Sequence, residues 1–254
     1  MKFWKLISLF LIFNLKIFSQ GTAGSGSTLE PRFIIDMPTA GIINHLNYAV
    51  DVDFYNAGGV LFGFSFGLLN TLNLGISYGG TNLIGSDKPI WNKLPGMSLK
   101  IRPLDETEFF PAIAFGFDSQ GKEEYIDSLS RYKIKSPGFY FVLSKNFASA
   151  GFLSVHLGSN YSLERADDDK DFNIFAGVEK TLTSFLSLVG EYNLAINDSN
   201  DKALGKGKGY LNISLRASVG KGFTIGVNLK DITNNQKKLN IANRTVSVEF
   251  IGIL

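Results

Sequence analysis

The 254-residue sequence contains no cysteine, and this absence limits how the chain can be stabilised. Without cysteine there is no disulfide framework and no lipid-anchored precursor. The chain after residue 20 also has no excess of basic charge. Three of the 25 Lys and Arg residues lie in the first twenty positions, which leaves 22 basic against 23 acidic residues. A nucleic-acid-binding protein usually needs a concentrated basic surface. The composition therefore excludes a disulfide-rich module and argues against a nucleic-acid partner.

The sequence also lacks an apolar run long enough to form a membrane-spanning helix. The opening stretch MKFWKLISLFLIFNLKIFSQ has lysines at its start and an apolar run over 6–13, which Asn14 and Lys16 interrupt. It ends in Ser19-Gln20, a small-residue neighbourhood suited to cleavage. A membrane anchor would need a longer apolar run. Residues 1–20 are therefore predicted to be a secretory signal peptide, so that the mature chain is exported.

Helical periodicity is absent from residue 45 onward, and alternation with a period of two takes its place. Between Gly209 and Asp231, apolar and polar residues alternate in two runs joined by Lys221-Gly222, which predicts a β-hairpin. The same alternation recurs along the chain and predicts an all-β fold of about twelve strands. The predicted strands are 46–54, 60–66, 72–78, 97–101, 113–117, 139–143, 153–157, 172–178, 186–194, 211–219, 223–229 and 246–250.

Short and long connections alternate between these strands. The connections 68–71, 103–108, 145–151, 180–184 and 220–222 are short, whereas 79–95, 118–136, 159–171, 195–208 and 230–244 are long and polar. Only the turn at 56–59 departs from this order. A meander places successive connections at opposite ends of its sheet, so one end should carry tight turns and the other the long loops. Transmembrane β-barrels are built in this way.

A soluble sandwich or lipocalin-like barrel would also alternate, but three features favour a membrane barrel. The apolar face of the strands carries almost no charge, aromatic residues gather at strand ends, and strands of nine to eleven residues can span a bilayer. Because no water satisfies an open sheet edge in a bilayer, the sheet must close. The sequence therefore predicts an up-and-down antiparallel transmembrane β-barrel, with charged side chains facing inward. The predicted lumen-lining residues are Asp51, Asp53, Lys100, Arg102, His156, Glu179, Glu191, Arg216, Lys230 and Glu249.

These inward charges allow two interpretations. They can line a narrow wet pore that selects small polar solutes, or they can pair across the lumen and close it. The predicted barrel spans residues 45–254, and residues 21–44 form either a periplasmic segment or a plug in the lumen. The sequence leaves these alternatives open.

Catalytic and metal sites are not expected. Outer-membrane lipid hydrolases aim a His and a Ser at the lipid, whereas Ser154 and His156 share the polar face, and Gly158 stands where such enzymes place a Ser. The acidic stretch ERADDDKD (164–171) lacks the ligand spacing of a calcium loop and is interpreted as a solvated loop. No cofactor, metal or catalytic residue is therefore assigned.

Several stretches resemble a bacterial family of outer-membrane barrels linked to exopolysaccharide secretion, together with its uncharacterised relatives. They are PLDETEFFPAIAFGFDSQG (103–121), YKIKSPGFYFVLSKN (132–146), DMPTAGII (36–43), SYGGTNLIG (77–85) and GVEKTLTSFLSLVGEYNLA (177–195). The resemblance implies a role at the surface of a Gram-negative cell or in export, and supplies no catalytic residue.

The functional hypothesis is a non-enzymatic, porin-like outer-membrane transport protein, acting as a small-solute pore or as a component of envelope polysaccharide export. The alternative is a closed structural barrel that displays the loops 79–95 and 118–136 to binding partners. A lipid hydrolase is a more remote alternative. The expected partners are membrane lipid, the barrel-assembly machinery, and polysaccharide or small polar solutes. The expected location is the bacterial outer membrane, reached after signal-peptide export.

Overall fold

The protein is a closed antiparallel β-barrel in the computed structural model, which describes residues 21–237 and 242–253. Its main sheet has thirteen strands, of which the two-residue β4 (Ile90–Trp91) pairs only with the end of β3. The other twelve strands form the wall and confirm the all-β, twelve-strand prediction. The signal peptide predicted over residues 1–20 lies outside the described residues. The wall strands are β1 (Asn47–Tyr55), β2 (Gly59–Leu68), β3 (Leu72–Thr81), β5 (Gly96–Leu104), β6 (Ala112–Asp118), β9 (Gly138–Ala148), β10 (Phe152–Tyr161), β11 (Asn173–Thr181), β12 (Leu186–Asn193), β13 (Tyr210–Gly220), β14 (Phe223–Lys230) and β15 (Asn243–Ile253).

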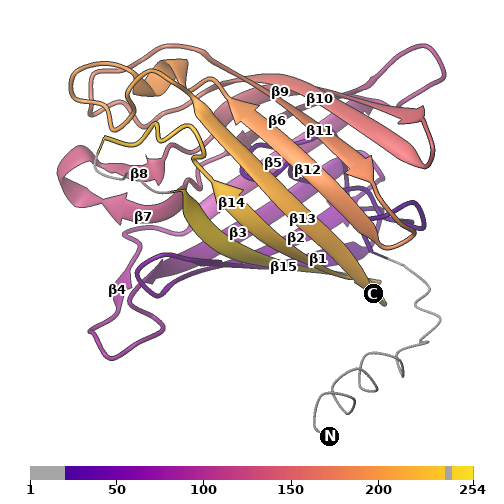
Figure 1. Cartoon of the computed structure of the whole chain (residues 1–254), viewed down its shortest axis with the longest axis horizontal. Helices are drawn as coiled ribbons and strands as arrows, with labels where there is room; N and C mark the ends of the chain where they lie inside the picture. The colour runs from indigo at the N-terminus through magenta and orange to yellow at the C-terminus, as the bar shows by residue number, and fades with distance from the viewer. Residues whose placement is uncertain (1–20, 238–241, 254) are drawn as a thin grey trace, which may run out of the picture.

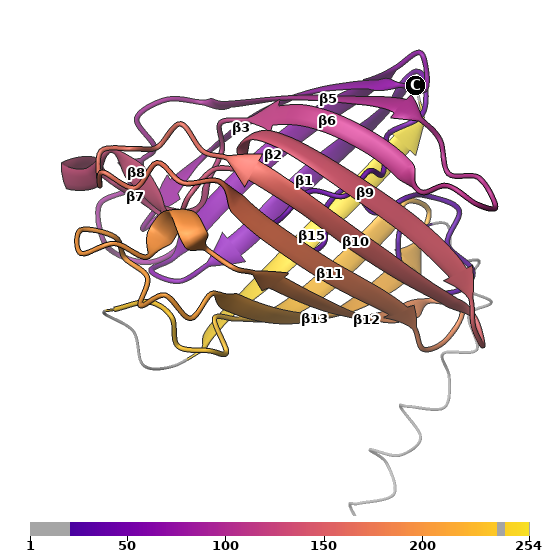
Figure 2. The same cartoon turned by 90° about the horizontal axis from the view of Figure 1, so that it is seen from above.

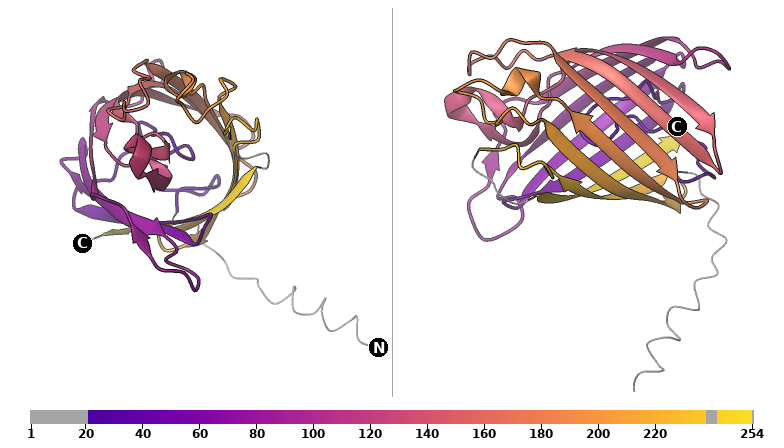
Figure 3. Two further views of the ribbon diagram at one scale, coloured as in Figure 1. Left: turned by 90° about the vertical axis from the view of Figure 1, so that its left-hand side faces the viewer. Right: turned by 45° about the horizontal axis from the view of Figure 1, so that its top comes forward.

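The wall closes where the first strand meets the last. β1 pairs with β15 in antiparallel register from Asn47↔Ile253 to Phe54↔Val246. Each other wall strand pairs with its neighbours along the chain, also antiparallel, so the barrel has up-and-down topology. Figure 3 (left) shows the closed ring. A closed sheet leaves no row of unpaired backbone groups at an edge, as a hydrocarbon layer requires.

Short and long connections lie at opposite ends of the barrel, as the sequence predicted (Figure 1). We call these the short-turn end and the long-loop end. The wall begins at Asn47 and finishes at Ile253, both at the short-turn end. The short-turn end carries residues 69–71, 105–111, 149–151, 182–185 and 221–222, and the long-loop end carries 56–58, 82–95, 119–137, 162–172, 194–209 and 231–237.

The outer face of the wall is apolar and the inner face is largely polar. In β14 every residue alternates between exposed and buried: Phe223, Ile225 and Val227 are exposed, whereas Thr224 and Asn228 are buried. The pattern recurs in β11 and β12. A continuous apolar surface of this extent is unfavourable in water, so the outer face suits contact with lipid.

The long-loop end contains elements that alternation did not predict. β7 (Lys122–Ile126) and β8 (Arg131–Ile134) pair as a hairpin around the 3-10 turn η1 (Asp127–Leu129), and a second 3-10 turn, η2 (Ile196–Asp198), lies between β12 and β13. Figure 2 shows this hairpin at the long-loop end, and Figure 3 (left) shows it over the barrel opening. These elements are three to five residues long, too short to establish a period.

Residues 21–44, which we call the inner segment, lie inside the barrel (Figure 3). Its side chains Ile34 and Met37 form a buried cluster with wall residues that include Val142, Phe175 and Val189. Near its end, Ile43 packs with Ala49 and Ile251 at the β1–β15 seam. The hydrophobic core of the protein is therefore enclosed by the wall, and it is separate from the apolar outer surface.

Candidate functional site: the barrel lumen

The inner segment first follows the wall near the short-turn end. The N–H groups of Thr22, Ala23 and Gly24 donate to the hydroxyls of Thr224 (3.0 Å), Ser218 (2.9 Å) and Ser187 (2.8 Å). Gly24 has a positive φ of 84°, and a Cβ there would lie 2.4 Å from the backbone of Phe185. Short polar side chains on β12, β13 and β14 thus bind the backbone of this part of the segment.

Arg32 joins the inner segment to the seam of the barrel. Its guanidinium binds Asp51 on β1 and Glu249 on β15, with Nη2 2.9 Å from Glu249 Oε1, and Nη1 donates to Ser65 Oγ at 3.2 Å. Asp51 and Glu249 stand directly opposite each other in the β1–β15 register. Two adjacent carboxylates would repel each other, and Arg32 supplies the compensating charge.

Lys100 and Glu191 bind the backbone of the inner segment. Lys100 Nζ donates to the carbonyls of Arg32 (3.1 Å), Thr39 (2.9 Å) and Gly41 (3.0 Å). Glu191 Oε2 accepts three N–H groups, from residues 35, 36 and 37, at 2.8–2.9 Å. Each buried ion therefore satisfies several backbone groups that the loop conformation leaves without a secondary-structure partner.

The other predicted lumen charges have partners on the inner segment, on the wall, in a short turn and in the hairpin β7–β8. Lys230 binds Asp36 at 2.6 Å, and Arg102 binds Glu30 and also Asp105, the latter at 2.8 Å. Arg216 donates to the carbonyls of residues 33 and 34, and its Nη1 lies 3.4 Å from Glu179. Asp53 binds Lys122 of β7 at 3.0 Å. Of the ten predicted residues, only Arg216 and Glu179 form a salt bridge with each other within the described part of the chain.

His156 contacts Ser144 on the neighbouring strand. Ser144 Oγ and His156 Nδ1 are 2.8 Å apart, and the same hydroxyl accepts the N–H of Ala40 at 2.9 Å. Ser154, the residue noted in the sequence, instead donates to Asn146. The cross-strand register pairs His156 with Ser144, and only this pairing could have identified the contact. Both side chains are buried inside the barrel, away from the apolar outer face.

Two cavities lie on either side of residues 31–41 of the inner segment. One, of about 300 Å³, is lined by Asn70 and Asp105 at the short-turn end and by Thr39, Ser144 and His156 deeper in the barrel. The other, of about 100 Å³, extends toward the long-loop end, where Asp118, Gln120 and Lys122 line it. Pro31 lines both cavities. The inner segment borders both spaces, because Arg32 and Ile35 line the second cavity and Thr39 lines the first.

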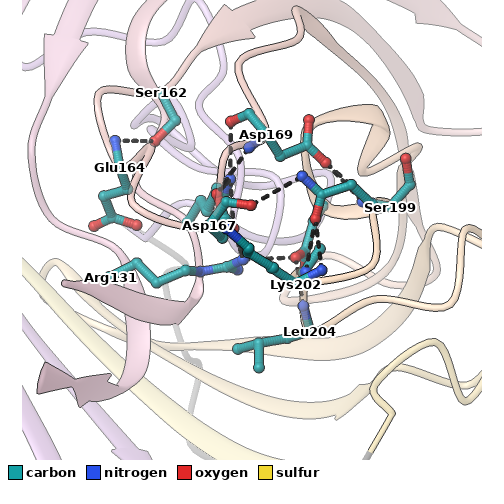
Figure 4. A network of polar contacts seen from close by, with 12 residues as sticks. Arg131, Ser162, Glu164, Asp167, Asp169, Ser199, Lys202 and Leu204 are labelled. Atoms are coloured by element: carbon teal, nitrogen blue, oxygen red, sulfur yellow. Dashed lines mark hydrogen bonds and ion pairs between the residues drawn. The ribbon is translucent and has the colours of Figure 1, made fainter. Parts of the chain in front are cut away.

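A buried ionic network ties the hairpin β7–β8 to two other long loops (Figure 4). Arg131 Nη1 lies 2.6 Å from both Asp167 and Asp198, and Lys135 binds Asp167 at 2.8 Å. Tyr210 on the wall donates to Asp198 at 2.6 Å. Burial alone would raise the pKa of Asp167, but Lys135 and Arg131 hold it below its ordinary value. This network was not anticipated, because its members come from three separate connections.

The network corrects the interpretation of residues 164–171 as a solvated loop. Asp167 and Asp169 are buried, and Asp169 accepts the N–H of Ser199 at 2.9 Å. Asp168, which binds Lys202, and Asp171 have the exposed positions expected of solvated charges. Asp167 looked solvated because its buried basic partners, Arg131 and Lys135, lie 36 and 32 residues earlier in the chain. Across residues 21–237 and 242–253, no group of three or more acidic, His or Cys side chains is arranged to hold a metal ion.

No protein-family model matches the chain, and no curated protein matches it. Among solved structures, the KdgM porin superposes with a TM-score of 0.51 at 13% identity, covering 80% of this chain and 98% of that chain. The KdgM porin in complex with disordered oligogalacturonate gives a TM-score of 0.48 at 12% identity, over 80% of this chain and 98% of that one. The Acinetobacter baumannii outer membrane protein Omp33 gives 0.44 at 8% identity, over 84% and 99%. The first likeness shows that the chain has a porin-like barrel fold.

Proposed function

We propose that the protein is a porin-like barrel of the bacterial outer membrane that passes small polar solutes, and that residues 31–41 hold it in a closed state. The apolar outer face, the closed sheet and the fold likeness to the KdgM porin support the membrane location. The observation that carries the pore function is the pair of polar-lined cavities inside the barrel, both bordered by the same loop segment. Displacing that segment would join them into one polar path.

The chemistry of the path supports small polar solutes of either charge or none. The cavity of about 300 Å³ offers amide, hydroxyl and imidazole groups beside Arg102 and Glu106. The cavity of about 100 Å³ places Arg216 and Lys122 near Asp53 and Asp118. No single sign of charge dominates, so strong ion selectivity is not expected. Ser144 and His156 are proposed to line this path and to have no catalytic role. Export of the precursor through a signal peptide and insertion by the barrel-assembly machinery complete the proposal.

A disulfide lock tests the pore function, because the natural chain contains no cysteine. Ala40 N lies 2.9 Å from Ser144 Oγ, so Ala40→Cys with Ser144→Cys places one thiol on the inner segment and one on β9. Planar-bilayer recordings should show discrete openings for the wild type and for the reduced double variant, and none after oxidation. Each single-cysteine variant is the matched control and should conduct under both conditions. Absence of discrete openings from folded wild-type protein would contradict the pore.

The second candidate function is a closed structural barrel that displays its long loops to partners. The observation that favours it is the number of lumen charges already bound to the inner segment. Envelope polysaccharide export is a further proposal, which rests on the sequence resemblance alone. Swelling of protein-containing liposomes in small sugars would favour the pore, whereas liposomes that stay impermeable would favour the structural barrel.

A further inference from the structure

The connection between β3 and β5, residues 82–95, is directed away from the barrel axis. Seen along the barrel in Figure 3 (left), it projects sideways beyond the wall. Its base is fixed to the β1–β2 turn, because Asn82 N–H donates to Ala57 O (2.8 Å) and Leu83 N–H donates to Gly58 O (2.9 Å). Gly58 has φ +58°, and a Cβ there would lie 2.0 Å from the carbonyl oxygen of Ile84. The sideways direction is therefore built into the packing of two turns.

This connection exposes large apolar side chains. Ile84 is 58% exposed, Ile90 57%, Trp91 54% and Leu94 70%. Every residue from 84 to 91 is exposed. A loop that only met water would gain nothing from four such side chains.

The exposed side chains continue the outer face of the wall. Trp91 stacks on Tyr78 with ring centroids 5.6 Å apart and planes 3° apart. Tyr78 belongs to the outer row of β3, together with Leu74 and Ile76. The strand β4 pairs with β3 through Gly80↔Trp91 and keeps the indole at this position. The apolar surface of the barrel therefore extends onto the loop without a polar break at Tyr78.

The charged side chains of this connection form no salt bridge within the described part of the chain. Asp87, Lys88 and Lys93 are exposed and form none of the salt bridges found among residues 21–237 and 242–253. By contrast, Lys122 of the next connection binds Asp53, and Arg131 binds Asp167 and Asp198. Two lysines flanking the exposed apolar pair Ile90 and Trp91 match a bilayer surface that carries anionic headgroups.

We propose that residues 83–95 are an interfacial anchor that enters the membrane surface beside the barrel. Ile84, Ile90, Trp91 and Leu94 lie at the boundary between headgroups and acyl chains, and Lys88 and Lys93 contact lipid phosphates. Trp is favoured at this depth, because its ring is apolar and its N–H can meet water. The anchor rests on the membrane location in the proposed function, but it adds a lipid-binding element outside the wall.

Trp91 itself reports on the proposal. The sequence has two tryptophans, so Trp4→Phe leaves Trp91 as the only one. This variant is reconstituted in phosphatidylcholine vesicles whose acyl chains carry bromine either near the headgroup or near the bilayer centre. The expected result is at least about a two-fold loss of Trp91 emission with the shallow bromine, a smaller loss with the deep one, and weak quenching by aqueous acrylamide. Unchanged emission with both lipids and strong acrylamide quenching would overturn the anchor.

A wall reporter separates failure of the anchor from failure of the membrane location. In Trp4→Phe with Trp91→Phe, Leu74→Trp places the only tryptophan on the outer face of β3. A quenched wall reporter beside an unquenched Trp91 overturns the anchor and leaves the proposed function standing. If neither is quenched, the membrane location itself is wrong. Lipid quenching of Trp91 that falls as the protein-to-lipid ratio rises would mean that a second copy covers the loop, and would also overturn the anchor.

The lysines have their own test. Adding phosphatidylglycerol to the shallow-bromine vesicles should deepen Trp91 quenching in the Trp4→Phe protein. The matched variant, with Lys88→Gln and Lys93→Gln added, should respond to phosphatidylglycerol by less than half as much. An equal response would remove the lysine–phosphate contact from the proposal.

Discussion

At the scale of single residues, Arg32 stabilises the lumen by neutralising two facing carboxylates at the seam. Replacing Arg32 by Met keeps much of its volume but leaves Asp51 and Glu249 without a cation. Removing one partner of a buried ion pair typically destabilises a protein by about 3–5 kcal/mol. Urea unfolding from lipid vesicles should therefore show a loss of about this size for Arg32→Met.

The matched control is Lys221→Met, a cation in the exposed β13–β14 turn, for which a change within about 0.5 kcal/mol is expected. Arg32→Lys should lie between the two, because it keeps the charge but loses the forked geometry. Equal stability of Arg32→Met and the control would show that the seam does not need this cation.

Glu164 gives the long-loop end a pH dependence. Burial raises the pKa of Glu164 from 4.5 to about 7, although its carboxylate accepts N–H bonds from Ser136 and Tyr132. A raised pKa means that the folded state favours the protonated acid, so its stabilising contribution is complete below pH 4.5 and is lost as pH rises through 7. Amide exchange at Ser136 and Tyr132, corrected for intrinsic rates, should show less protection at pH 8 than at pH 5, by at most about 2 kcal/mol.

Glu164→Gln is the control for this pH effect, since a glutamine cannot titrate. Protection of the same two amides should then be independent of pH between 5 and 8. If the wild type and Glu164→Gln respond alike, another group causes the pH dependence.

Alternation predicted the inward direction of the lumen charges but could not predict their partners. A period of two assigns Lys100 and Glu191 to the inner face whatever occupies the barrel. Their actual partners are backbone groups of residues 32–41, and backbone groups leave no trace in sequence composition. Of the two interpretations left open, pairing across the lumen does not describe Asp51, Lys100 and Lys230, whose partners lie on the inner segment.

At the scale of elements, the hairpin β7–β8 is held over the opening by Arg131. Arg131→Met leaves Asp198 with hydrogen bonds from Tyr210 and Leu204 but without a cation. The hairpin should therefore open locally while the wall stays paired, because its strands form a two-stranded sheet of their own, separate from the sheet of the wall. Limited trypsin digestion should cleave after Lys122 or Lys133 at least about ten times faster than in the wild type, with the circular dichroism of the barrel unchanged.

Arg165→Met provides the comparison, because Arg165 lies in the same loop region but stacks on Tyr161 instead of binding an acid. It should leave the cleavage rate near that of the wild type. Cleavage within wall strands of Arg131→Met would mean that the hairpin and the barrel unfold together.

Long strands could be predicted from the sequence more readily than short ones. The hairpin β13–β14 supplies eleven and eight residues of alternation, so its period is unmistakable. β4 and β8 supply two and four, and their pairing depends on turn geometry and on distant ionic contacts. Loop length and polarity therefore predicted the position of the long-loop end, but not its buried network.

At the scale of the whole molecule, the barrel has two separate apolar regions. One is the enclosed cluster around Ile34 and Phe175, which water-soluble proteins also have. The other is the outer face of the wall, where Leu215 on β13 and Val227 on β14 face each other in register, both exposed. In a soluble barrel the second region would be the solvated surface. Whether lipid or water contacts this outer face therefore distinguishes the proposed membrane protein from a soluble one.

Val227 is 59% exposed and lies near the middle of β14, so a substitution there tests whether lipid or water surrounds the outer face. In a bilayer, Val227→Arg places a charge among acyl chains and should reduce the free energy of folding into vesicles by about 2–4 kcal/mol. On a water-exposed surface the same change should stay within about 0.5 kcal/mol. Lys221→Arg, in the turn that follows β13, controls for the arginine itself and should be neutral. A loss below about 0.5 kcal/mol for Val227→Arg would mean that water, not lipid, surrounds the wall, and the pore and the interfacial anchor would both be excluded.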